Sequence, residues 1–287
     1  MMKQFILLLA LWGMGFLGGT MSLTAQESFY DTALPLVDKK DTAALRLLLD
    51  KWQTTAPQDA DRYAIQANYD LVKYILFVQQ HHGKSDTPSD SIFQETRRLE
   101  QAVTTHLAEG IARFPNRLDL RYGQIHQQLI MYNYASALEA IKATIAHSAT
   151  NGNSWLWTND KARNLSDKDL TLDMQDYFSR LWSAQQFDKA EEMALAFLKV
   201  YPKSVIFRSN LASIHGARGD YKGALPFVEA LHHEVPNDHL IHYNLAYVYK
   251  QLGEKKKAVK CLKKLVKCDD EKVVQNAQVL LKELGEK

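Results

Sequence analysis

The chain holds one group of residues whose side chains commonly bind metals. His232, His233, His239 and His242 fall within eleven residues of each other. His239 and His242 are three residues apart, about one turn of a helix, so their imidazoles could reach the same ion. A metal site also needs converging geometry and a second layer of hydrogen bonds, and this segment supplies no sign of either. We therefore expect no metal and no other cofactor.

A second unusual segment runs from Trp155 through Trp157 to Asp160. Two tryptophans two residues apart share a face in an extended chain and diverge on a helix. In one interpretation they form an aromatic shelf for a peptide or a glycan, and Asp160 and Asp169 act as an acid/base pair. In the other, the segment folds back and fills a gap, since each tryptophan buries a large area. The first interpretation provides the alternative function: a glycan-binding protein or an enzyme centred on Trp155–Asp160.

The motifs of common catalytic sites are absent from the sequence. It contains no glycine-rich phosphate loop, no His-Glu-x-x-His and no nucleophile elbow around a serine. Cys261 and Cys268 would lie about 10 Å apart along a continuous helix, beyond the roughly 7 Å that a disulfide spans. We expect these thiols to stay unpaired unless the helix ends before Cys268, and we expect the protein not to be an enzyme.

The composition and the first residues indicate an exported protein. A net charge of +2 with 46% hydrophobic and 24% charged residues is typical of a folded protein and argues against a dedicated nucleic-acid binder. Lys3, the apolar run 5–17 and Ala25 have the pattern of a secretory signal peptide. The run is shorter than the roughly 20 residues of a membrane span. We expect no stable membrane span after cleavage behind Ala25, and a periplasmic, envelope-associated or secreted location.

A fixed spacing of 34 residues predicts the elements that position these side chains. Ala190, Ala224 and Ala258 follow it, and Pro202 and Pro236 keep the same register. A 34-residue period with a small residue in the second helix and a closing proline is typical of tetratricopeptide helix–turn–helix repeats. Over residues 171–270 the chain resembles the tetratricopeptide repeat family, and with its leader it is similar to exported repeat proteins of Gram-negative bacteria. The resemblance implies an all-α, right-handed α-solenoid.

The same register divides the chain into six segments. After the signal peptide (1–25) we expect an N-terminal helical region with degenerate hairpins (26–117) and a degenerate repeat (118–149). An inserted aromatic loop (150–170), three repeats (171–270) and a capping helix (271–287) follow. Amphipathic spacing predicts helices over 41–52, 59–80, 91–114 and 271–284, and no strand is expected.

The resemblance also implies a function, the recognition of a protein or peptide in a concave groove. By register, the partner-binding residues would be Tyr122, His126, Trp182, Asn210, Tyr243, Asn244, Tyr247 and Lys250. One subset of the family binds a terminal carboxylate through paired lysine and asparagine residues. Asn210 and Asn244 occupy the asparagine position, but Ser209 and Tyr243 stand where that subset has lysine, so carboxylate binding is not expected. We expect a binding scaffold whose partner the sequence does not identify.

Overall fold

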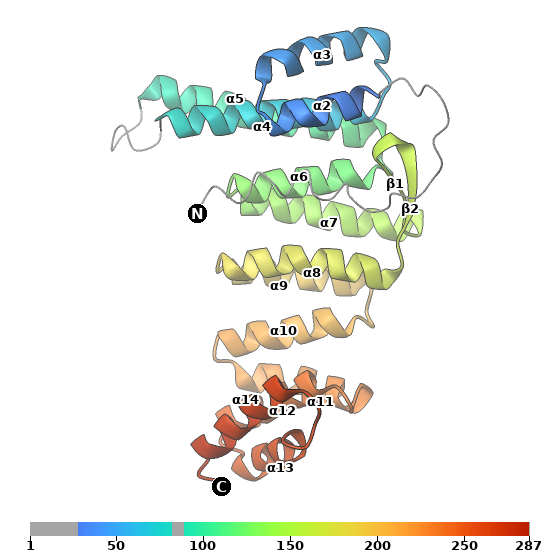
Figure 1. Ribbon diagram of the computed structural model, residues 1–287. Helices are drawn as coiled ribbons and strands as arrows, with labels where there is room; N and C mark the ends of the chain where they lie inside the picture. Colours follow the sequence, from blue (N-terminus) through green and yellow to red (C-terminus); the bar gives the residue numbers. More distant parts are fainter. Residues whose placement is uncertain (1–27, 82–88, 287) are drawn as a thin grey trace. The chain divides into compact units, whose positions relative to one another are not determined.

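The computed structural model describes residues 28–81 and 89–286 (Figure 1). The predicted signal peptide and most of a polar break around residue 85 lie outside these ranges. The described residues form thirteen α-helices and one β-hairpin. The fold is therefore all-α and of the α-solenoid type, built from successive helical hairpins.

The chain divides into two compact units. Unit 1 contains the described residues up to Ala140 together with Asn151–Asn164, and unit 2 contains Ile141–Thr150 and the chain from Leu165 onward. The division falls inside helix α7 (Tyr134–Asn151), which begins in unit 1 and continues in unit 2. The segment Asn151–Asn164 that follows belongs to unit 1 again.

Unit 1 begins with five helices whose positions largely follow the amphipathic pattern. They are α2 (Phe29–Asp38), α3 (Thr42–Thr55), α4 (Asp61–His81), α5 (Asp90–Arg113) and α6 (Leu118–Ile130). Helices α3, α4 and α5 begin within two residues of their predicted starts. Helix α2 was not predicted as a separate element. Its N-terminus is capped by Ser28, whose side chain accepts a hydrogen bond from the Asp31 N–H at 3.0 Å.

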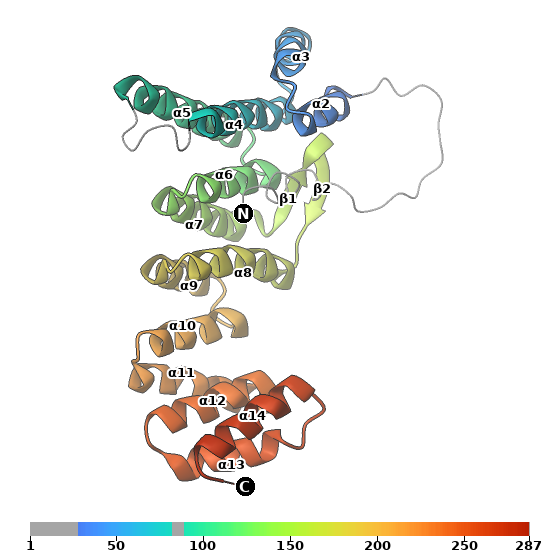
Figure 2. The same cartoon turned by 60° about the vertical axis from the view of Figure 1, so that its left-hand side comes forward.

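Two close contacts hold the helices of unit 1 in place. The fully buried Trp52 stacks on Phe29 with ring centroids 5.2 Å apart, which joins α3 to α2. Helices α4 and α5 lie side by side in both Figure 1 and Figure 2. Gly110 of α5 makes this approach possible, because a Cβ atom there would lie 2.8 Å from the Cβ of Tyr63. The absence of a side chain at one residue thus sets how closely the two longest helices of the unit pack.

The insertion folds as a β-hairpin, which corrects the expectation of a loop without strands. Strand β1 (Ser154–Trp157) pairs antiparallel with β2 (Lys161–Asn164), and the short η2 turn (Thr158–Asp160) joins them. Asn159 and Asp160 adopt positive φ angles of 58° and 50°, a conformation that asparagine and aspartate tolerate better than most residues. Strands of only four residues give a periodicity too short to recognise in the sequence.

Unit 2 consists of helical hairpins in the predicted register. After the end of α7 come α8 (Asp167–Ser183), α9 (Phe187–Val200), α10 (Val205–Ala217), α11 (Tyr221–Glu234), α12 (His239–Gln251), α13 (Lys255–Leu265) and α14 (Glu271–Glu283). Ala190, Ala224 and Ala258 are fully buried. Gly219 and Gly253 turn the chain with φ angles of 74° and 75°, which glycine adopts without steric cost.

The predicted capping helix forms the end of unit 2. Helix α14 packs against both α12 and α13 (Figure 2), and its residues Val273, Ala277, Leu280 and Leu281 join a core with Ala246, Leu262 and Leu265. Helix α13 ends at Leu265, before Cys268, yet Cys261 and Cys268 are both free thiols. Packing of helices therefore stabilises this end of the chain without a disulfide.

Candidate functional site

The first helices of the three hairpins in unit 2 carry aliphatic side chains that are exposed or half-buried at equivalent positions. Leu172 of α8 is 50% exposed and Leu240 of α12 is 61% exposed, while Ile206 of α10 is half-buried. Each is 34 residues from the next, and Val274 of α14, also half-buried, continues the series. We call these four residues the aliphatic row. Apolar side chains that stay at least partly exposed at one register position of successive repeats make this face a candidate contact surface, since contiguous exposed apolar patches mark interaction sites.

Tyr247 lies on the same face of α12 as the aliphatic row, seven residues after Leu240, and is 36% exposed. Its ring meets that of Tyr221 edge-on, with centroids 6.1 Å apart. A hydrogen bond between the two side chains, followed by burial, raises the pKa of Tyr221. The Lys250 ammonium lies 6.0 Å from the centre of the Tyr247 ring and forms an ion pair with Glu283 of α14. This part of the face is therefore aromatic, with its cation already paired.

Three other predicted partner-binding residues of unit 2 have partners within the repeats. Asn210 is 9% exposed and donates a hydrogen bond from Nδ2 to Oε1 of Gln175 at 2.6 Å, which joins α10 to α8. Trp182 is half-buried between Phe178 and Phe187, with ring centroids 6.1 and 5.0 Å away. Tyr243 is half-buried against the terminal core, and burial raises its pKa. Asn210 thus connects two neighbouring hairpins, and Trp182 connects the two helices of one hairpin.

Asn244 is half-buried on α12, and the two remaining predicted residues belong to unit 1. His126 of α6 is half-buried, and Tyr122 of the same helix is 7% exposed. The ring of Tyr122 meets Trp157 of the hairpin edge-on at 6.1 Å. The structure therefore groups Tyr122 with the insertion, and it groups Tyr243, Tyr247 and Lys250 with one another on α12.

The tryptophans of the insertion pack inside unit 1. Trp155 is 1% exposed and its Nε1 donates to Asn153 at 3.3 Å. The guanidinium of Arg163 lies 4.5 Å from the centre of the Trp157 ring. With one ring buried and the other flanked by Arg163 and Tyr122, the two tryptophans do not offer a shared open face on which a sugar could stack.

Arg117, at the start of α6, attaches the hairpin to unit 1 and is 1% exposed. Its guanidinium donates to Asp119 at 2.9 and 2.6 Å, to Asp160 at 3.2 Å, and also to Asp61. The backbone N–H of Asn159 donates to the second oxygen of Asp61 at 2.9 Å. One arginine thus connects α4, α6 and the hairpin turn.

The electrostatics of this cluster follow from its burial. Burial opposes the charge of Arg117, but hydrogen bonds and attraction from Asp119 and Asp61 raise its pKa above the ordinary value. Burial raises the pKa of Asp61 although Arg117 acts in the opposite direction. The carboxylates of Asp61, Asp119 and Asp160 share the guanidinium of Arg117. Asp160 thus forms an ion pair that holds the hairpin turn, and this contact does not support its pairing with Asp169 as an acid and a base.

No group of three or more histidine, cysteine, aspartate or glutamate side chains in the described ranges is arranged to hold a metal ion. The described chain also has no helix with the length and apolar character that crossing a membrane requires.

Comparisons with known proteins agree with the repeat architecture. Residues 217–281 match the model of a family described as tetratricopeptide repeat. The similarity to that family in sequence is thus carried by this segment. It spans the end of α10 to α14, which includes Tyr247 and Leu240. The match supports a role in protein–protein interaction in general.

Several solved structures are similar at low identity. A tetratricopeptide repeat protein from Parabacteroides merdae is 14% identical, with a TM-score of 0.38, over 90% of this chain and 91% of that one. The crystal structure of MamA is 10% identical, with a TM-score of 0.38, over 69% and 98%. The tetratricopeptide domain of P58(IPK) is 13% identical, with a TM-score of 0.34, over 90% and 65%. Scores this low support no further conclusion. No match in sequence was found among curated proteins.

Sequence reasoning missed the aliphatic row. The signal that reveals it was present, because Leu172, Ile206 and Leu240 obey the same 34-residue spacing as the buried alanines. Spacing alone does not mark these positions as exposed, and an isolated leucine near a helix start has no distinctive chemistry.

Proposed function

We propose that this protein is an exported, non-catalytic scaffold that binds a protein or peptide on the face formed by α8, α10 and α12. The observation that supports this most strongly is the aliphatic row beside Tyr247. Leu172 and Leu240 remain half or more exposed although the alanines at other repeat positions are fully buried. Burying such side chains in an interface yields roughly 25 cal/mol per Å² of apolar surface.

The face also favours one kind of partner segment. It combines three aliphatic side chains with an exposed tyrosine, and its Lys250 is neutralised by Glu283. A partner that depended on a terminal carboxylate would lack its counter-charge here. A partner segment fits better if it presents several apolar side chains and, between them, one group that contacts the ring of Tyr247, because aromatic residues often dominate interface energies.

The test compares capture of partners by two matched variants. One replaces Leu172, Leu240 and Tyr247 by serine, and the control replaces Leu195 and Val279, which are 53% and 56% exposed on α9 and α14. Both mature proteins must first show equal helicity by circular dichroism. We expect the face variant to lose binding to a peptide array and to proteins of a native envelope extract, and the control to retain it. Equal binding by both variants would reject this face.

Export is tested on the same protein. Cleavage behind Ala25 would give a mature chain that begins at Gln26, and intact mass measurement of protein recovered from the cell envelope or medium identifies that end. A full-length mass in a cytoplasmic fraction would contradict export and leave the binding proposal untouched.

A further inference from the structure

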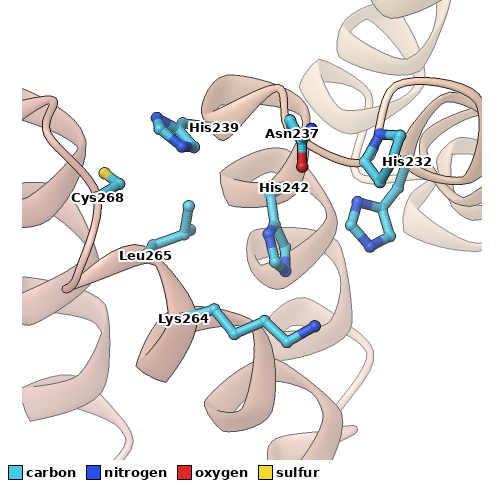
Figure 3. Close-up of a pocket in the computed structure, with 8 residues that line it drawn as sticks. His232, Asn237, His239, His242, Lys264, Leu265 and Cys268 are labelled. Atoms are coloured by element: carbon cyan, nitrogen blue, oxygen red, sulfur yellow. The ribbon is translucent and has the colours of Figure 1, made fainter.

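A cavity of about 330 Å³ lies where α11, α12 and α13 meet in unit 2. Its walls are formed by His232, Pro236, Asn237, His239, His242, Lys264, Leu265 and Cys268. Figure 3 shows the rings of His232 and His242 beside each other, with Lys264 extending beneath them and His239 and Cys268 toward the other end. The cavity thus brings three imidazoles and one ammonium group together from three helices.

The lining side chains carry no negative charge to balance these groups. Two acidic residues nearby are engaged elsewhere: the Asp238 side chain caps α12 through the Ile241 N–H at 3.0 Å, and Glu234 pairs with Arg208 at 2.6 Å. Asp269 is 96% exposed and lies 3.7 Å from Nδ1 of His239. Asp270, two residues after Cys268, caps α14 through the Val273 N–H at 3.0 Å. The lining itself therefore contains basic side chains and no carboxylate.

One imidazole of the cavity has unused hydrogen-bonding capacity, and a second lies against it. Nδ1 of His232 is buried and has no hydrogen-bond partner, although a buried polar atom without a partner is costly. Its ring centroid is 4.5 Å from that of His242, which is 6% exposed. Burial first, and then the positive neighbours His232, Lys264 and His239, lower the pKa of His242 to about 4. An anion between these groups would offset the repulsion and accept their hydrogen bonds.

We propose that this cavity binds a phosphate-class oxyanion, either free phosphate or the phosphoryl group of a small ester, through His232, His242 and Lys264. A phosphate carries up to two charges and several acceptor oxygens near neutral pH, so it suits three converging donors better than a single carboxylate. Charge-assisted hydrogen bonds to such groups are about twice as strong as neutral ones. The cavity shares no lining residue with the aliphatic row, and the proposal does not depend on the proposed scaffold function.

The direction in which anion binding depends on pH follows from the basic side chains that line the cavity. Protonation of the imidazoles adds positive charge, so an anion binds more tightly as pH falls. Bound anion in turn stabilises the imidazolium forms and raises the pKa of His242 from about 4. Sulfate is the probe for this property, because its charge stays constant between pH 5.5 and 7.5.

The experiment records the histidine side-chain resonances of the mature chain by NMR during titration with inorganic phosphate, at constant ionic strength set by sodium chloride. We expect saturable shifts of His232 and His242, and sulfate binding that weakens as pH rises from 5.5 to 7.5. Glycerol 3-phosphate in a parallel titration separates a site for free phosphate from one for an ester. Absence of saturable shifts with all three anions would overturn the proposal, as would equal shifts with chloride.

Matched variants connect any binding to the cavity. Lys264→Gln and His232→Gln remove donors, and we expect each to weaken phosphate at least about tenfold, the usual effect of losing one charge-assisted hydrogen bond. Lys256→Gln and His233→Gln remove the same charges at exposed positions of the same helices and should bind like the wild type. Equal weakening in both pairs would show general attraction to a basic surface and would reject the site.

Discussion

Arg117 shows how much of unit 1 depends on one side chain. Its guanidinium is 1% exposed and contacts Asp61, Asp119 and Asp160, which come from three separate elements. A buried ion pair adds little net stability compared with apolar packing, but removal of one partner leaves a buried charge without compensation. Replacement of Arg117 is therefore the change that best measures the effect of this cluster on stability.

Arg117→Gln is expected to lower the free energy of unfolding by about 3–5 kcal/mol, the usual cost of an uncompensated buried charge. Urea denaturation followed by circular dichroism measures it. Because burial raises the pKa of Asp61, the loss should shrink as pH falls through that raised pKa and the carboxyl takes up a proton. Arg113→Gln, at an exposed position of α5, is the control and should stay within about 0.5 kcal/mol. A loss of similar size in both variants would contradict the role of Arg117.

A second residue-level prediction concerns pH. Nδ1 of His106 on α5 lies 2.8 Å from the carboxylate of Asp70 on α4, and this hydrogen bond raises the pKa of His106. A raised pKa means that the folded state holds the proton more tightly, so the stabilisation is complete below the ordinary value of about 6.5 and fades as pH rises through the folded value. The stability difference between wild type and His106→Gln should decrease between pH 6 and pH 8. Urea midpoints at several pH values measure it, and a difference that grows with pH would reject the assignment.

At the scale of elements, the approach of α4 to α5 depends on Gly110. A methyl group there would lie 2.8 Å from the Tyr63 Cβ and 3.1 Å from Leu120 Cδ1. Gly123 of α6 provides the comparison, because a Cβ atom there would meet Leu107 at an ordinary 3.6 Å. Replacing each glycine by alanine therefore tests whether helix packing or helix propensity determines the change in stability.

Gly110→Ala is expected to destabilise the protein by about 1–3 kcal/mol, because the two helices must separate to admit the methyl group. Gly123→Ala should be neutral or should stabilise by up to about 1 kcal/mol, since alanine favours the helix. Thermal and urea unfolding of both variants measure these effects. Stabilisation by Gly110→Ala would show that α4 and α5 do not pack this closely in solution.

At the scale of the whole molecule, each repeat is stabilised mainly by the repeats next to it. Helix α14 illustrates this, since Leu280 and Leu281 complete a core that contains Leu262 and Leu265 of α13. A defect in α14 should therefore spread to its neighbours and weaken with distance along the chain.

Leu280→Ala should accelerate amide hydrogen exchange in α12 and α13 and leave exchange in α4 and α5 unchanged, because a buried leucine contributes about 2–5 kcal/mol to its local core. Exchange measured by mass spectrometry resolves these segments. Val279→Ala, a 56% exposed position on the same helix, serves as the control and should change little. Faster exchange throughout the chain would indicate one cooperative unit in place of nearest-neighbour stabilisation.

The sequence predicted those features that depend on local spacing. The starts of α3, α4 and α5 follow from amphipathic periods, and the buried alanines of unit 2 follow from the 34-residue repeat. It did not predict that Arg117 would join Asp61 to the hairpin, because these contacts connect residues 56 and 98 positions apart. The role of Asn210 was also hidden, since its hydrogen bond to Gln175 crosses between repeats.

The return of residues 151–164 to unit 1 has a consequence for the order of events during synthesis. The ribosome delivers α4 long before Asn159, whose N–H reaches Asp61 across 98 positions. Until the hairpin emerges, Asp61 and Arg117 lack part of their final surroundings, so the N-terminal unit is completed only after about 160 residues are made. The hairpins of unit 2 pair residues much closer in sequence and can add one after another as translation proceeds. A pause in translation after the hairpin has left the ribosomal exit tunnel would thus separate the completion of the first unit from the addition of the later helices of the second.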